Sequence, residues 1–372
     1  MVLLLVMVRL PATAGVMDQT PADPAEALAI SDPLIDAAFR QSVELVYQER
    51  FEACMALLDD LSRQRPHHPA PDFIRAAAYQ SWMNTYRTNR FTAAMDAHLD
   101  AAIEKGRSLL ETGEDPWLHV FIGAAKGFRA LNRFRRGQWM SALTNITGAV
   151  DNLQHALRTA PQIYDAYMGI GTYNYWRSAR SKFISNIAFW MTDRREVGLE
   201  QMRFVVAHGV YSAHETSYNL AAALIDHNHP LEALSLLAEN VRQKRSVGLI
   251  DLYYRGRALQ ASGRWAPALS DFKALSERLE AAPLTATGYR AECSYRMALS
   301  FYHLNRRRDA QEAVTAAITL ADRRIPADEI DNSFETFGDI LEGLNALRLR
   351  LEQPMMEESH RYSGQVSAAP LN

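Results

Sequence analysis

Two stretches of the sequence hold residues whose types and spacing could do chemistry. In the first, GIGTYNYWRS, Gly169 and Gly171 stand two residues apart and are followed by Tyr175 and Trp176. Glycines at this spacing could cradle a phosphate, as in the Gly-x-Gly-x-x-Gly loop that binds dinucleotides. The third glycine of that loop is missing, and no strand-like segment precedes the stretch. We therefore predict that both glycines are sites of close packing between two helices.

Histidines supply the second stretch. His208, His214, His227 and His229 precede or occupy the turn of one predicted helix pair. Because imidazole nitrogens bind zinc, a metal-dependent enzyme centred on this region is one hypothesis, and it predicts bound metal. The simpler interpretation is a set of exposed turn histidines. The full sequence has no Walker A loop, no His-Glu-x-x-His and no Gly-x-Ser-x-Gly. We therefore expect a chain that is not an enzyme and needs no cofactor or metal.

The bulk composition limits the classes of function. Of 372 residues, 48% are hydrophobic and 22% are charged, as in a folded globular protein, and the net charge is −3. A protein with this charge is not expected to bind nucleic acid. Arginine clusters at residues 133–136 and 306–308 fall at predicted turns, where solvent or helix C-termini would accommodate them. The distant Cys54 and Cys293 are expected to be buried free thiols.

The N-terminal segment reads MVLLLVMVRLPATA, a short apolar run followed by small residues. This pattern predicts a signal peptide over residues 1–14, cut after Ala14, and export to the periplasm. No basic residue precedes the apolar run, so the untidy N-terminus of a cytoplasmic protein is the alternative. The run is too short to span a bilayer as a helix. Residues 15–30 are then expected to be a linker.

Helical spacing of apolar residues dominates the rest of the chain, and the pattern repeats. Six segments can be aligned on an anchor residue early in the second helix of a pair: Cys54, Ala94, Ala142, Ala233, Ala268 and Ala310. Five residues before each anchor stand Glu49, Asn89, Gly137, Asn228, Gly263 and Asn305. Glycine and asparagine tolerate the left-handed conformation that ends a helix, so this position predicts the turn between two helices.

Local signals place several helix ends. Residues 32–33 and 115–116 are both Asp-Pro, which combines an N-cap aspartate with a first-turn proline. The segment SAHE, residues 212–215, predicts a capping box. A last helix over residues 331–351 is expected to cover the end of the array, and residues 353–372 are expected to form a flexible tail.

The recurring turn and packing positions resemble those of the tetratricopeptide repeat (TPR) family over roughly residues 31–325. The resemblance implies an all-α fold, a right-handed superhelical α-solenoid of TPR-like helix pairs with a concave inner face. About seven pairs and the capping helix would occupy residues 31–352. Because the anchors lie farther apart than the family's repeat of about 34 residues, several helices must be longer than usual.

An aromatic residue recurs fifteen positions before most anchors, and the resemblance places it on the concave surface. This column contains Phe39, Tyr79, Tyr218, Tyr253 and Tyr295, and a neighbouring column adds Tyr86 and Tyr302. Two interpretations stay open. The rings could line a groove for an extended peptide or an apolar ligand, since tyrosine offers both apolar area and a hydroxyl. They could instead pack against one another as core.

One helix pair is interrupted by an apolar insertion at about residues 177–193, which carries Phe183, Phe189 and Trp190. The insertion could pack on Tyr175 and Trp176, form an exposed lip that contacts a partner, or dip into a membrane interface. A Gly-x-Gly-x-Tyr-x-Tyr motif before such an insertion is similar to an arrangement in uncharacterised bacterial envelope proteins with these repeats.

The sequence as a whole predicts a non-catalytic scaffold of the bacterial cell envelope that binds a protein or peptide along the aromatic column. The alternative is a periplasmic carrier or membrane-proximal protein that holds an apolar ligand in the same groove. Tyr175 and Trp176 would extend the groove towards the insertion.

Overall fold

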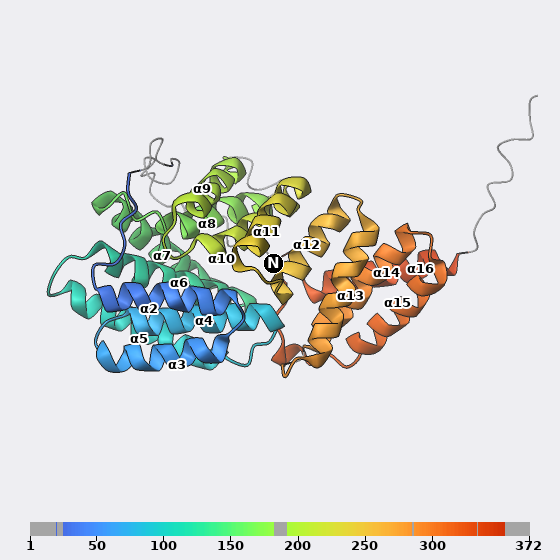
Figure 1. Cartoon of the computed structure of the whole chain (residues 1–372), viewed down its shortest axis with the longest axis horizontal. Coiled ribbons are helices and arrows are strands. Elements are labelled where there is room, and N and C mark those ends of the chain that lie inside the picture. Colours follow the sequence, from blue (N-terminus) through green and yellow to red (C-terminus); the bar gives the residue numbers. More distant parts are fainter. Residues whose placement is uncertain (1–19, 21–24, 182–191, 285, 333, 354–372) are drawn as a thin grey trace, which may run out of the picture.

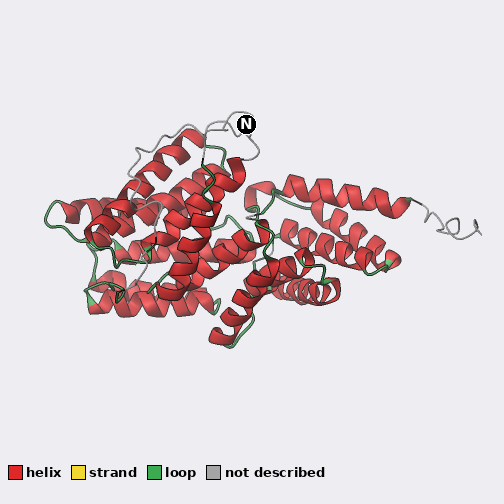
Figure 2. Ribbon diagram, turned by 90° about the horizontal axis from the view of Figure 1, so that it is seen from above, coloured by secondary structure: helices red, strands yellow, loops and turns green. Residues whose placement is uncertain are grey.

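The computed structural model describes residues 20, 25–181, 192–284, 286–332 and 334–353, which fold into α-helices joined by short turns (Figure 1). These residues form no β-strand, and Figure 2 shows the same all-helical architecture from above. None of the described helices combines the length and the apolar character needed to cross a membrane. The all-α fold predicted from the sequence is confirmed.

The described helices follow one another as seven pairs and a final helix. The pairs are α2 (Pro33–Tyr47) with α3 (Phe51–Gln64), α4 (Ala70–Tyr86) with α5 (Thr92–Leu110), α6 (Pro116–Arg135) with α7 (Trp139–Thr159), α8 (Ala166–Ser181) with α9 (Arg195–His208), α10 (Ala213–Asp226) with α11 (Pro230–Lys244), α12 (Leu249–Ala261) with α13 (Trp265–Ala281), and α14 (Thr287–His303) with α15 (Arg307–Ala321). The short 3₁₀ helix η2 (Pro326–Asp328) precedes α16 (Phe337–Glu352). Each helix packs mainly on its neighbours along the chain, as in an α-solenoid.

The turns within the pairs lie where the sequence predicts them, with one exception. Five of the six predicted residues have positive φ: Glu49 (60°), Gly137 (71°), Asn228 (63°), Gly263 (73°) and Asn305 (56°). In the second pair the left-handed residue is Arg87, at φ 56°, and not Asn89. The shift has a tertiary cause, since the backbone N–H of Asn89 donates to the carbonyl of Asp328, 2.9 Å away.

Both predicted Asp-Pro caps are confirmed. Asp32 accepts hydrogen bonds from two first-turn N–H groups of α2, and Asp115 accepts one from α6. The predicted capping box at residues 212–215 is wrong, although α10 does begin at Ala213. The hydroxyl of Ser212 donates to Asp165 (2.7 Å), and the side chain of Glu215 bonds to Ser81 on α4. Both side chains are therefore used in contacts between helices.

Small residues allow the helices of a pair to approach closely. Among the anchors, Cys54, Ala142, Ala233, Ala268 and Ala310 are buried, whereas Ala94 is half-buried. Opposite the anchor of the sixth pair, a Cβ on Gly256 would lie 2.8 Å from the ring of Phe272. A larger side chain at such positions would force the two helices apart.

The glycines of the GIGTYNYW stretch also mediate close packing, which confirms that prediction. Gly171 lies on α8 and faces Gly198 on α9: a Cβ on Gly198 would be 2.6 Å from the carbonyl oxygen of Gly171 and 2.7 Å from the backbone nitrogen of Tyr175. The glycines thus bring two helix backbones together.

The predicted apolar residues of the insertion, Phe183, Phe189 and Trp190, lie outside the described residues, as do the predicted signal peptide (1–14) and residues 354–372 of the predicted tail.

The first helices also contact later parts of the chain, namely α10 and the segment before α16, whereas α13 to α16 extend away from them (Figure 1). The ring of Tyr47, at the end of α2, stacks on His214 of α10 with centroids 4.0 Å apart. The turn after α4 pairs with the segment before α16: the N–H of Ile330 donates to the carbonyl of Arg87 (2.9 Å), and Thr88 bridges to Glu329. Later parts of the same chain therefore pack on the ends of α2 and α4.

Both ends of the array differ from the sequence-based prediction. The described part of the expected linker, residues 25–30, is held in place: Leu28 donates its N–H to the carbonyl of Gln162 (3.0 Å), and Ile30 is buried and donates to the phenol oxygen of Tyr211 (3.0 Å). At the other end, α16 begins at Phe337 rather than at residue 331. The preceding residues run as an extended link that is tied to α12 and α14.

Candidate functional site

The predicted aromatic residues separate into two groups by burial. Four rings are buried, with at most 8% of their surface exposed: Tyr175, Tyr218, Tyr253 and Tyr295. Five are half-buried: Phe39, Tyr79, Tyr86, Trp176 and Tyr302. The first group cannot line an open groove in this conformation, so the interpretation of these four rings as a groove is replaced by that of core residues.

Hydrogen bonds fix three of the buried phenols. Tyr218 donates to Asp251 (2.8 Å) and Tyr253 donates to Glu292 (2.7 Å). Tyr175 donates to the carbonyl of Ala223 (2.8 Å) and lies 2.7 Å from a carboxylate oxygen of Asp226. Burial raises the pKa of Tyr218 and of Tyr253 well above the ordinary value, so both phenols remain protonated donors. These tyrosines link neighbouring pairs of the array.

The half-buried rings form local contacts and not one continuous stripe. Each has a different aromatic neighbour: Phe39 stacks on Tyr211 (4.4 Å), Tyr79 on Phe91 (5.2 Å), Tyr86 lies edge-on to Phe51 (6.4 Å), Trp176 to Tyr175 (5.0 Å), and Tyr302 to His303 (5.4 Å). Binding of a partner through these rings stays a prediction, and of the five only Phe39 has a neighbour that also lines a cleft.

That cleft has a volume of about 530 Å³ and lies between α2 and the segment that leads into α10. Its lining residues are Ala37, Arg40, Gln41, Val43, Glu44, Gly209, Val210, Tyr211, Ala213 and His214. The volume lies within the range of about 300–1,000 Å³ that is typical of ligand sites. Sequence reasoning missed the cleft because its two walls are separated by some 170 residues of the chain.

A buried carboxylate holds one wall of the cleft in shape. Asp165 accepts hydrogen bonds from the backbone N–H groups of Val210 (3.0 Å), Tyr211 (2.8 Å) and Ser212 (2.7 Å), and it is only 8% exposed. The guanidinium of Arg40, on the opposite wall, lies over the ring of Tyr211 at 5.2 Å. Asp165 thus positions the wall at residues 210–212, and the contact of Arg40 with Tyr211 joins this wall to α2.

The cleft carries both signs of charge. Arg40 and Glu44 stand one turn apart on α2, and their side chains are 50% and 57% exposed. His214 faces Glu44 across the cleft with a nitrogen–oxygen distance of 3.7 Å, while burial lowers the pKa of His214. Near neutral pH the imidazole is therefore uncharged, and it can donate or accept a hydrogen bond. Val43, Val210 and Tyr211 supply apolar surface between these polar groups.

A buried ion pair lies where the first pair of the array meets α12. Lys244 pairs with Asp251, and their side chains are 1% and 0% exposed. Lys244 also lies 3.3 Å from the phenol oxygen of Tyr218, and the carboxylate of Glu49 accepts the N–H of Leu249 at 2.6 Å. The residue types would suit acid–base chemistry, but side chains this inaccessible cannot meet a substrate in this conformation. The pair instead joins α11 to α12, and the contact of Lys244 with Tyr218 adds α10.

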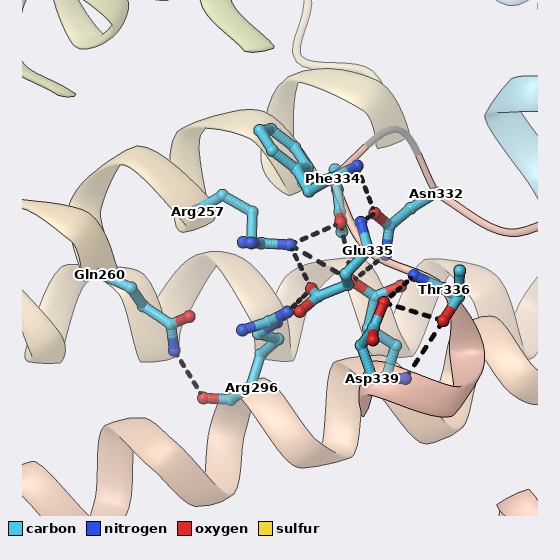
Figure 3. A network of polar contacts seen from close by, with 10 residues as sticks. Arg257, Gln260, Arg296, Asn332, Phe334, Glu335, Thr336 and Asp339 are labelled. Carbon is cyan, nitrogen blue, oxygen red and sulfur yellow. Dashed lines mark hydrogen bonds and ion pairs between the residues drawn. The ribbon is translucent and has the colours of Figure 1, made fainter. Parts of the chain in front are cut away.

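A second polar network ties the end of the array to its middle (Figure 3). Glu335 accepts hydrogen bonds from Arg257 (2.7 Å) and from Arg296, and Asn332 donates to Glu292 (3.1 Å). As Figure 3 shows, these side chains converge from α12, α14 and the link before α16. Sequence reasoning missed them because charged residues scattered over three elements leave no local motif.

Arginines of the two predicted clusters differ in burial and in hydrogen bonding. Arg308 is exposed, as expected at a solvated turn, and Arg307 donates to the last carbonyls of α16, as expected of a cation near a helix C-terminus. Arg135 departs from the prediction, because it is half-buried and donates to Asn84 on α4 (3.2 Å). Cys54 and Cys293 are buried free thiols, as predicted.

The histidines that suggested a metal-dependent enzyme do not converge in the described residues. His214 stacks on Tyr47, and His208 lies beside Phe204. The rings of His227 and His229 are neighbours, with centroids 5.2 Å apart, and His227 bonds to Glu196 at 2.8 Å, but neither His208 nor His214 joins them in a common site. Among the described residues, the one group of histidine, cysteine or acidic side chains with metal-binding spacing contains Glu114, His119 and His155, which were not singled out from the sequence.

This chain is similar to solved structures of helix-repeat proteins at low sequence identity. No family model and no curated protein match this sequence. The C-terminal part of a TPR repeat-containing protein from Cytophaga hutchinsonii is 16% identical, with 78% of this chain and 97% of that chain covered and a TM-score of 0.39. A Rap protein in complex with competence and sporulation factor is 12% identical over 77% of each chain, with a TM-score of 0.46. Yeast Tom70 is 11% identical, with 82% of this chain and 87% of that chain covered and a TM-score of 0.32. By its own helix pairs, left-handed turns and buried small residues, this chain is an all-α solenoid of TPR-like helix pairs.

Proposed function

We propose that this chain is a non-catalytic scaffold that binds a protein or peptide of the bacterial cell envelope. The observation that carries the proposal is the cleft of about 530 Å³ between α2 and the segment that leads into α10, in an array where four rings of the predicted aromatic groove are buried. Helix-pair solenoids present extended surfaces to partners. We therefore place the bound segment in the cleft and not along the buried tyrosines of the aromatic column.

The lining of the cleft fits a peptide segment. A peptide offers N–H and carbonyl groups, and Gln41 and His214 are side chains that can pair with both. Arg40 and Glu44 can pair with side chains of either charge, and Val43 and Val210 can pack on an apolar one. We infer that the bound segment is extended, since the floor of the cleft runs along a helix.

The alternative is a carrier that holds an apolar ligand. The side chains of Arg40 and Glu44, which are 50% and 57% exposed at the cleft, make this less favourable, because an apolar ligand would remove water from the Arg40–Asp36 ion pair and from the carboxylate of Glu44. Native mass spectrometry of the purified protein separates the two proposals. A stoichiometric co-purifying lipid would favour the carrier, and its absence is expected of the scaffold.

We propose further that the chain is exported, on the basis of its N-terminal pattern. N-terminal sequencing of the mature protein is expected to start at Gly15. A protein that retains residues 1–14 and fractionates with the cytoplasm would contradict export.

Site-directed photo-crosslinking in cells tests the scaffold. A photoreactive residue replaces Gln41, which is exposed and lines the cleft, and the control position is Ala316, which is exposed on α15. We expect a discrete protein adduct from position 41 and none from position 316. Combining the position-41 probe with Ala37→Trp, which fills the cleft, is expected to abolish the adduct. An adduct that survives Ala37→Trp, or a failure to form any adduct, would contradict the proposal.

A further inference from the structure

We propose that Glu114, His119 and His155 form a binding site for a first-row divalent metal ion of the zinc type. Glu114 lies in the loop before α6, His119 on the second turn of α6, and His155 near the end of α7. One ligand atom from each residue lies within 4.8 Å of the others. Two imidazoles and one carboxylate are a ligand set that zinc accepts, with a fourth position left for water.

A hydrogen bond to Asn152, on the side of the ring away from Glu114, fixes the orientation of His119. Its Nδ1 lies 3.2 Å from Oδ1 of Asn152, and the amide nitrogen of Asn152 donates to the carbonyl of Gly148 at 2.7 Å. Because Asn152 presents an oxygen, Nδ1 of His119 must carry the proton and donate it. A histidine held in this way has its other nitrogen, Nε2, available with a lone pair, which is the common arrangement behind a metal ligand.

The Nε2 atom of His119 has no hydrogen-bond partner, although it is sealed from solvent. It faces a carboxylate oxygen of Glu114 at 3.6 Å. A lone pair that faces a carboxylate in a buried setting is unfavourable unless a cation lies between them. A second proton on His119 would meet this need, and so would a metal ion that both atoms coordinate.

His155 favours the metal over the second proton. Its ring lies against that of His119, with centroids 4.0 Å apart, and within the described structure it forms no hydrogen bond through its side chain. One divalent ion would satisfy both rings and the carboxylate.

Metal binding requires the three side chains to move closer together. Ligand atoms around a tetrahedral zinc ion, at bond lengths of about 2.0–2.1 Å, lie about 3.4 Å from one another, whereas these three lie within 4.8 Å. Glu114 is 70% exposed and sits in a loop, so its side chain can move, and the two imidazole rings, whose planes are 33° apart, must turn so that their lone pairs converge. The two histidines come from paired helices of one repeat unit, so the ion would join α6 to α7 at the end nearest the preceding turn.

Isothermal titration calorimetry with Zn²⁺ alone, on the full chain after dialysis against a chelator, tests the site. The wild type is expected to bind one ion, and His155→Ala and Glu114→Gln are expected to lose that binding event. The matched control is His67→Ala, an exposed histidine outside the cluster, which should bind as the wild type does. Asn152→Ala is expected to weaken binding by roughly 10–100-fold through loss of the supporting hydrogen bond.

Two results would overturn the proposal: no zinc binding by the wild type, or binding that His155→Ala and Glu114→Gln leave unchanged. Circular dichroism checks that each metal-free variant is folded. If His155→Ala does not fold, the exposed Glu114→Gln decides the matter by itself. The thermal midpoint gives a second readout, since Zn²⁺ should raise it for the wild type and for His67→Ala but not for the two ligand variants.

Discussion

The carboxylate of Glu49 accepts a hydrogen bond from the backbone N–H of Leu249 at 2.6 Å, which joins residues 200 positions apart. This contact lies at the point where the first turn of the array meets the start of α12. Lys244 and Asp251 form their buried ion pair beside it. The bond therefore joins the first pair of the array to α12, and it depends on a carboxyl group that has lost most of its contact with water.

Glu49→Gln is expected to change the pH dependence of stability. Burial raises the pKa of Glu49 above its ordinary value, so the folded state holds a proton that the unfolded state releases near pH ~4.3. The stability that this group contributes is complete below that pH and is lost as the pH rises through the folded pKa. Glutamine does not titrate, so the variant does not lose stability in this way. The difference in free energy of unfolding, variant minus wild type, should therefore become more positive as the pH rises, and urea unfolding at a series of pH values measures it.

The matched control for this change is Glu52→Gln, on the exposed face of the next turn. It should follow the pH dependence of the wild type. A Glu49→Gln profile that runs parallel to that of the wild type between pH 4 and 8 would show that Glu49 does not titrate in this way.

Gly198→Ala should be strongly destabilising. The new methyl group would lie 2.6 Å from the carbonyl oxygen of Gly171 and 2.7 Å from the nitrogen of Tyr175, and both of these are backbone atoms that cannot rotate away. Overpacking of this kind costs about 1–3 kcal/mol or more in free energy of unfolding. Chemical denaturation measures the loss.

Gly127→Ala is the companion variant, because no heavy atom lies within 4 Å of a Cβ at this position on α6. Removing a helix-interior glycine there should stabilise the protein by about 0.5–1 kcal/mol. If both alanine variants had the same effect, the close approach of α8 and α9 would be refuted.

Tyr253→Phe tests whether the buried phenols are structural. The hydroxyl donates to Glu292 at 2.7 Å and accepts from Arg257 at 3.0 Å, so its removal leaves a buried carboxylate short of a donor. The expected cost is about 1–3 kcal/mol in free energy of unfolding. Tyr302→Phe, on a half-buried ring, should change it by less than about 0.5 kcal/mol. Equal effects of the two variants would argue that the Tyr253 hydroxyl is not engaged.

Tyr211→Phe should release the segment before α2. The phenol oxygen of Tyr211 accepts the N–H of Ile30 at 3.0 Å and bonds to Asp36. Hydrogen exchange at the amide of Ile30 is therefore expected to become faster, while the amide of Leu28, which bonds to Gln162, keeps more of its protection. Unchanged exchange at Ile30 would mean that other contacts hold the segment.

Local signals in the sequence were sufficient for the helix pairs. The left-handed residues Gly137, Gly263 and Asn305 and the buried Ala233 and Ala268 are all positions where a single residue's conformation or size decides the structure. These requirements depend on the residue type alone, so they can be recognised without knowledge of distant neighbours.

Features that depend on distant neighbours could not be predicted. Ser212 and Glu215 have the spacing of a capping box, yet Asp165, in the turn before α8, and Ser81, on α4, form hydrogen bonds with them. The sequence shows that the aromatic residues recur, but the burial of Tyr253 depends on its contact with Glu292 of the next helix pair. The cleft between α2 and α10 and the cluster of Glu114, His119 and His155 likewise consist of residues that are distant in the sequence and close in the fold.

The contacts of the first helices with later parts of the chain cover two rings of the aromatic column, because Tyr47 packs on Tyr218 and the guanidinium of Arg87 lies over Tyr253. A distance measurement by double electron–electron resonance tests these contacts, with spin labels at Gln48→Cys and Ser246→Cys, both exposed positions near the Glu49–Leu249 contact. The native Cys54 and Cys293 are fully buried and should escape labelling. Labels at Gln48→Cys and Ala316→Cys give a longer reference distance along the array. A single narrow distribution at short distance for the first pair is predicted; a broad distribution, or one as long as the reference, would contradict these contacts.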